Sequence, residues 1–168
     1  GGGPARFVSA SSFAPALITL GAKVKLVSPS GSRQVDVARF FVSPKDGDTR
    51  EVDLKPNEIL TEIVIPAATG IKSATYEVRQ KEALDWPLAA ASVALKMKGT
   101  AVSEGRIVLG HVAPVPYHAK EASEWLAGKT ITAATAAEAA EAAVRGAQPV
   151  QTNGYKVQLA KTAVKRAL

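Results

Sequence analysis

The side chains with catalytic or metal-binding chemistry are few, and the two histidines are the first to consider. His111 and His118 are the only histidines, and two of the six residues between them are proline. A metal-binding pair on one helix needs a spacing of three or four residues, so we interpret both as structural histidines at the surface or at a helix cap. Cysteine is absent, which excludes thiolate ligands and disulfides. A Ser-His-Asp triad stays a weak hypothesis, because its members meet only in space and no Gly-x-Ser-x-Gly motif occurs.

Gly105 and Gly110 have the glycine spacing of a phosphate-binding loop. The segment 105–111 (GRIVLGH) lacks the lysine and the hydroxyl that follow the second glycine in such a loop. It also lies within a predicted strand, where a phosphate loop cannot form. We therefore predict no phosphate cradle at these two glycines.

Two tryptophans are the other residues with recognisable chemistry. Trp86, between Asp85 and Pro87, has a ring that could stack on a ligand or close the core. Large aromatic side chains mostly serve packing, so we interpret Trp86 as a packing residue. For the same reason we expect Trp125 at an interface between a helix and a sheet.

Composition restricts the classes of protein that these residues can belong to. The chain has 168 residues, of which 46% are apolar and only 5% aromatic, so Ala, Val, Leu and Ile must fill one medium core or two small ones. A net charge of +6 keeps nucleic-acid binding open as a third hypothesis. No dense basic run occurs, so we expect no nucleic-acid partner.

No apolar run approaches the ~20 residues that cross a bilayer, and no signal peptide is visible. We therefore expect that the chain does not associate with a membrane and that it is located in the cytoplasm.

The first part of the chain reads as a helix followed by three strands. Residues 12–20 can form a helix that Ser11 or Ser12 caps and that ends at Gly21. Alternation of polar and apolar residues predicts strands over 23–27 and 33–37, joined by a turn. Residues 58–65 form a further predicted strand, which Pro66 closes.

The second part reads as three strands followed by three helices. Strands are predicted over 73–80, 88–98 and 106–112, with Gly99 and Gly105 between the last two. Such a series is most simply antiparallel. Helical periodicity then predicts helices over 119–127, 135–145 and 155–168. One sheet face covered by helices is the natural packing, which gives an α+β fold.

Five phrases, in this order along the chain, resemble the FAD-binding medium subunit of the molybdenum hydroxylases, the group of xanthine and carbon monoxide dehydrogenases. They are SFAPALITLGA at 12–22, PNEILTEIVIP at 56–66, RQKEALDWPLAAA at 79–91, LGHVAPVP at 109–116 and LAGK at 126–129. The resemblance covers nearly the whole chain but only the C-terminal half of that subunit. It implies that residues 1–66 are a partial second FAD-binding subdomain. Residues 71–168 are then the C-terminal domain, with a three-stranded antiparallel sheet packed on three helices.

The resemblance also implies a set of cofactor-binding residues. Ser12 falls where the family usually has an aspartate that contacts FAD. Ile59 and Leu60 match the apolar pair beside the isoalloxazine ring, and Glu77 falls near a position that is often lysine and lies close to that ring. No catalytic side chain and no metal ligand is implied, because the cofactor carries the redox step.

Cofactor binding by this portion alone is a separate question. The family's glycine-rich pyrophosphate loops lie upstream of the matched segment, so we expect FAD to bind weakly or not at all here, and we expect no activity. The implied partners are the N-terminal FAD subdomain, a subunit with 2Fe–2S clusters and a molybdopterin subunit. Electrons would pass from the clusters to FAD and then to an external acceptor. A non-enzymatic protein-interaction module stays open as the alternative.

Overall fold

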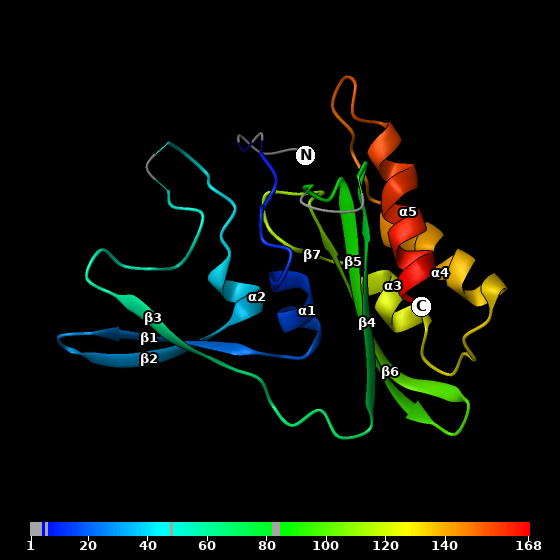
Figure 1. Cartoon of the computed structure of the whole chain (residues 1–168), viewed down its shortest axis with the longest axis horizontal. Coiled ribbons are helices and arrows are strands. Elements are labelled where there is room, and N and C mark those ends of the chain that lie inside the picture. Colours follow the sequence, from blue (N-terminus) through cyan, green and yellow to red (C-terminus); the bar gives the residue numbers. More distant parts are fainter. Residues whose placement is uncertain (1–4, 6, 48, 82–84) are drawn as a thin grey trace.

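The computed structural model describes residues 5, 7–47, 49–81 and 85–168, which form two antiparallel sheets with helices between them and on one side. The first sheet has the strand order β2-β1-β3, and the second has the order β4-β5-β6-β7. Figure 1 shows α1 and α2 between the two sheets, and α3, α4 and α5 on the far side of the second sheet. No helix in the described ranges combines the length and the apolar character that crossing a membrane requires.

The first sheet forms as the alternation of its residues predicts. β1 (Lys23–Ser28) and β2 (Gly31–Asp36) make a hairpin whose turn uses Gly31 at φ 135°, a conformation that favours glycine. β3 (Ile59–Val64) pairs with the other edge of β1. A single turn of helix, α2 (Val37–Phe40), helps to close a small core around the buried Leu26. The predicted hairpin and the strand before Pro66 are confirmed.

Helix α1 (Ala14–Thr19) is shorter than predicted, because its first helical residue is Ala14. The Ser11 hydroxyl accepts the backbone N–H of Ala14 at 3.0 Å, so Ser11 satisfies one of the donors at this end. Gly21, just past the helix, has φ 69°. This left-handed conformation ends the helix as the sequence predicts.

The second sheet contains β4 (Ile71–Val78), β5 (Ala89–Lys98), β6 (Ala101–Gly110) and the two-residue β7 (Tyr117–His118). The three long strands confirm the predicted antiparallel series. The start predicted for β6 was wrong, because the turn before it lies at Gly99 (φ 62°) and Gly105 lies within the strand. β7 was missed because two residues after Pro116 carry no periodicity that a sequence pattern can detect.

Three helices cover one face of the second sheet, as predicted. They are α3 (Lys120–Trp125), α4 (Ala133–Val144) and α5 (Tyr155–Ala167). Thr132 and Thr135 form a capping box at the start of α4. The core between helices and sheet consists mainly of alanine and of aliphatic side chains, with Leu126 fully buried. Small side chains let the helices approach the sheet closely, so this core is dense without aromatic residues.

Candidate functional site

The face of the second sheet that α3–α5 leave open is the place where α1 docks. A Cβ atom on Gly110 of β6 would lie 2.9 Å from Cγ of Pro15, so only glycine permits this approach. Further along β6, the Arg106 guanidinium donates to the Thr19 carbonyl at 3.4 Å. The open face of the second sheet is therefore joined to the first part of the chain through α1.

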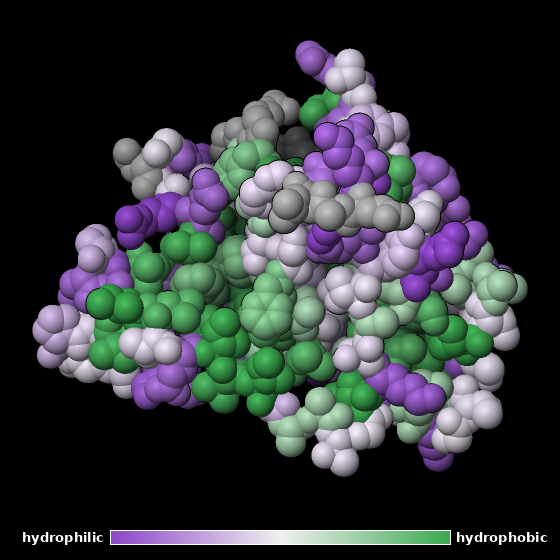
Figure 2. All heavy atoms as spheres, viewed as in Figure 1, coloured by the Kyte–Doolittle hydropathy of each residue, from purple (hydrophilic) through white to green (hydrophobic). Residues whose placement is uncertain are grey.

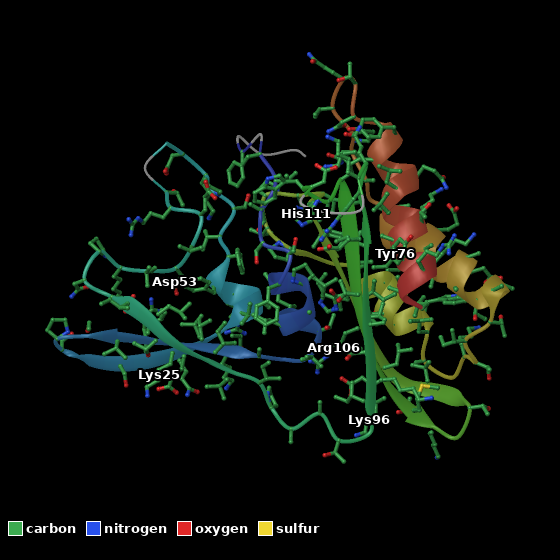
Figure 3. All side chains as sticks on the ribbon, in the orientation of Figure 1. Lys25, Asp53, Tyr76, Lys96, Arg106 and His111 are labelled. Carbon is green, nitrogen blue, oxygen red and sulfur yellow. The ribbon has the colours of Figure 1, made fainter. Side chains whose placement is uncertain are left out.

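His111 lies at the end of β6 where this joint meets the loop after the strand (Figure 3). Its ring Nε2 is 3.1 Å from the Ser12 hydroxyl, and Lys156 donates to its carbonyl oxygen at 2.6 Å. The side chain is 3% exposed and the backbone has φ 61°. His111 is thus buried, which corrects our expectation of a surface or cap histidine. His118 is exposed, as expected.

Glu77 approaches the same region from β4, which is separated from β6 by β5. Glu77 pairs with Ala90 of β5, and Ala90 pairs with Gly110 of β6. These three residues form one row across the sheet, and Gly110 directly precedes His111 in the chain. The Glu77 carboxylate pairs with Arg79, just after the end of β4. The structure therefore brings Ser12 and Glu77, two residues that the resemblance implicates, to the surroundings of one histidine.

The electrostatics of this cluster favour a neutral imidazole. Burial lowers the pKa of His111, the nearby Glu77 carboxylate opposes this shift, and the Lys156 and Arg79 cations add to it. Burial also lowers the pKa of Lys156. A neutral imidazole can form one hydrogen bond with the Ser12 hydroxyl, as donor or as acceptor, without burying a charge. Sequence reasoning missed this role of His111, although the residue stands inside the phrase LGHVAPVP.

The other implicated pair, Ile59 and Leu60, belongs to the first sheet. As consecutive residues of β3 they lie on opposite faces. Leu60 packs against the small core, whereas Ile59 is 69% exposed. The two side chains therefore do not share one face of β3, and the role of both residues in cofactor binding stays a prediction.

An ion-pair cluster holds the chain just before Ile59. Arg33 of β2 donates to both carboxylate oxygens of Glu58 and also to Asp53. These bonds raise the pKa of Arg33 and lower the pKa of Asp53, while the pKa of Glu58 falls to about 2, chiefly because of its hydrogen bonds with Arg33. The cluster fixes the start of β3, a role for Arg33 that sequence reasoning did not find.

An apolar surface runs along β3, which we call the apolar seam. It consists of the exposed side chains of Ile59 and Ile63, which lie on one face of β3, and of Ile65 just after the strand; Val64 is exposed on the opposite face. Figure 2 shows apolar atoms gathered over the first sheet and over the connection from it to β4. A contiguous group of exposed apolar side chains can mark an interaction surface, so the apolar seam is a candidate contact surface.

The charged part of a dinucleotide has no comparable receptor among the described residues. Among the described residues, five glycines have positive φ: Gly21 and Gly128 follow helices, Gly31 begins β2, and Gly70 and Gly99 precede strands, so none begins a helix. A pyrophosphate needs several backbone N–H groups that converge at such a place. None of these glycines among the described residues therefore forms a pyrophosphate-binding turn at the start of a helix.

The two tryptophans behave differently. Trp86 is 67% exposed, so our interpretation of it as a packing residue was wrong. Its neighbours 82–84 lie outside the described residues, and Asp85 accepts the backbone N–H of Lys81 at 3.1 Å. Trp125 packs against the core of the second sheet as expected, and Lys129 lies 4.8 Å from its ring centre.

Comparison with known protein families agrees with this geometry. Residues 1–68 match the FAD binding domain in molybdopterin dehydrogenase, and residues 74–168 match the CO dehydrogenase flavoprotein C-terminal domain. The chain therefore belongs to the FAD-binding medium subunits of the molybdenum hydroxylase family.

Individual relatives are similar in sequence and in structure. The carbon monoxide dehydrogenase medium chain of Hydrogenophaga pseudoflava is 33% identical over 159 residues, which are 92% of this chain and 54% of the relative. The glyceraldehyde dehydrogenase medium chain of Sulfolobus acidocaldarius is 32% identical over 122 residues, which are 73% of this chain and 41% of the relative. The chain thus spans about half the length of these relatives.

Solved structures show the same arrangement. Carbon monoxide dehydrogenase from Hydrogenophaga pseudoflava matches with a TM-score of 0.81 and 31% identity, over 94% of this chain and 55% of that chain. Quinoline 2-oxidoreductase from Pseudomonas putida 86 also has a TM-score of 0.81, with 28% identity over 95% of this chain and 55% of that chain. The α+β fold predicted from the sequence is confirmed.

Proposed function

We propose that this chain supplies one wall of the FAD site of a molybdenum hydroxylase and takes part in electron transfer from iron–sulfur clusters to an external acceptor. When bound, FAD supplies the capacity to accept and release electrons. The chain's own residues position its ring and exclude water from it. We further propose that the chain divides between residues 66 and 71, at the connection between the two sheets.

The observation that carries the proposal is the apolar seam in a chain of this family. Ile59 is 69% exposed, although the ion pairs of Arg33 hold its strand firmly. Exposing a large aliphatic side chain on a rigid strand is unfavourable unless another surface covers it. We propose that the flavin ring and the upstream half of the FAD-binding domain cover the seam.

Ser12 and Glu77 have supporting roles in this proposal. Ser12 connects the segment before α1 to His111, and Glu77 lies in the row of sheet residues that ends beside the same histidine. The Ser12 bond joins the part of the chain before α1 to the end of the second sheet. We propose that both lie near the flavin, Ser12 as a hydrogen-bonding group and Glu77 as a charge that influences its potential.

A chimaera tests the proposal most directly. This chain would replace the matching part of the Hydrogenophaga pseudoflava medium chain, and bound flavin would be measured by absorbance after gel filtration. We expect the chimaera to retain FAD and this chain alone to retain little or none. Ile59→Asp should abolish retention by the chimaera, whereas Val150→Asp, at a residue 41% exposed between α4 and α5, should not. Equal retention by both variants would contradict the proposal.

The proposed partners need a separate experiment. Tagged chain co-expressed with the iron–sulfur and molybdopterin subunits of a relative should recover both subunits. Recovery of unrelated proteins and of neither subunit would instead support the interaction-module hypothesis. A cytoplasmic location stays a prediction from the sequence.

A further inference from the structure

A cavity lies on the helix side of the second sheet, away from the apolar seam. It has a volume of about 200 Å³ and lies between β6, the loop that follows it, the end of α4 and the start of α5. Val8, from the segment before α1, also lines it. Its walls are mainly aliphatic and include Leu109, Val144 and Val157.

Lys156 is the one charged side chain among the described residues that line this cavity. Its ammonium donates to the His111 carbonyl at 2.6 Å. An ammonium carries three N–H donors, so this single bond leaves donor capacity for a ligand. Lys156 forms no ion pair with any carboxylate in the described ranges of the chain.

Another lysine of α5 differs from Lys156 because a carboxylate neutralises its charge. Lys161 pairs with Glu141 of α4 at 2.7 Å. In addition, the first turn of α5 contains no acidic residue, so the positive end of its helix dipole also lacks a carboxylate of its own. A half-buried cation beside apolar walls thus lies in a field that favours an anion.

We propose that this cavity binds a small monocarboxylate with a compact apolar body. The carboxylate would accept hydrogen bonds from Lys156, and the apolar body would pack against the aliphatic walls. The volume is below the ~300 Å³ at which ordinary drug-sized ligand pockets begin, so a nucleotide or a flavin is too large. A phosphate is disfavoured because a single half-buried cation cannot replace the hydration of a doubly charged ion.

The test uses benzoate and its neutral isostere benzamide as probes of the whole chain. Backbone amide NMR shifts of residues 143–160 would be followed during titration with each probe. We expect benzoate to shift these amides selectively and to bind at least about tenfold more tightly than benzamide, because a charge-assisted hydrogen bond contributes that much. No benzoate-dependent shift in this range, or equal binding of the two probes, would overturn the proposal.

Matched variants separate the charge from the shape of the cavity. Lys156→Met should weaken benzoate binding about tenfold or more, and Lys156→Arg should restore most of it. Lys161→Met, on the same helix but outside the cavity, should change binding less than about twofold. Ala147→Leu, at an exposed residue of the rim, should weaken both probes by filling space. Equal benzoate affinities of the Lys156→Met and Lys161→Met variants would overturn the proposal.

Discussion

The two sheets of this chain bury very different shares of their strands. In β5, the first seven of ten residues are buried, under α1 on one face and under the helices on the other. In β3, none of the six residues is buried. The centre of the second sheet is therefore covered on both faces within the chain, whereas β3 and the edge strand β4 each have no buried residue. The covered centre is what we expect of a sheet with a core of its own, and the open β3 is what we expect of one part of a larger cofactor site.

The two regions also differ in the interactions that hold them. Around the second sheet, alanine and aliphatic side chains pack in a dense core. The first sheet depends more on charged side chains, with Arg33 bonded to Asp53 and Glu58, and Lys25 paired with Glu62 at 2.6 Å. Ion pairs respond to salt and pH in a way that apolar packing does not. The stability of the first sheet should therefore depend more on solution conditions.

The largest effect should come from the core of the second sheet. Leu126 is fully buried, so Leu126→Ala should lower the free energy of unfolding by about 2–5 kcal/mol. The matched control is Ile59→Ala in the apolar seam, for which we expect a change within about 0.5 kcal/mol. Urea denaturation of both variants measures the contrast. A loss at Ile59 as large as that at Leu126 would show that the seam is already covered.

A smaller effect should come from the joint between the two regions. Gly110→Ala places a methyl group 2.9 Å from Pro15 Cγ, so α1 must shift away from the sheet. We expect a loss of about 1–3 kcal/mol, the usual cost of overpacking. Gly105→Ala on the same strand meets its nearest atoms at 3.4 Å and should cost less. Equal losses by urea denaturation would mean that α1 does not need its close approach to Gly110.

The ion pairs of the first sheet should give a pH-dependent effect. The pKa of Glu58 is about 2 in the folded chain and 4.5 ordinarily. Glu58 therefore contributes stability that is fully present above pH 4.5 and is lost as the pH falls towards 2. Arg33→Gln removes the main cause of this shift, so stability should decline less steeply over that range.

Unfolding measured at several pH values tests this expectation, with Arg39→Gln as the control at an exposed arginine of α2. Carboxyl NMR shifts should show the pKa of Glu58 moving back towards 4.5 in the Arg33 variant alone. Identical acid profiles for the parent and the Arg33→Gln variant would mean that the cluster does not stabilise the first sheet.

Patterns local in sequence were predictable, and contacts distant in sequence were not. The hairpin, the long strands and the three C-terminal helices follow from periodicity and from turn residues such as Gly21 and Gly99. His111 contacts Ser12, which lies 99 residues away in sequence, and no spacing rule predicts such a contact. Trp86 was misjudged for the same kind of reason. Residue type favours packing, but exposure is decided by how the chain folds around the residue.

The smallest effect should come from the bond between Ser12 and His111. Ser12→Ala removes one hydrogen bond of about 0.5–1.5 kcal/mol and leaves the alanine core of the second sheet intact. Ser30→Ala, in the exposed hairpin turn, is the matched control and should change stability less. NMR signals of the His111 ring should shift in the Ser12 variant only. A Ser12→Ala variant with unchanged ring signals would mean that the segment before α1 docks without this bond, through the backbone bond from Ser9 to Ala113 and the packing of Pro15 in α1 against Gly110.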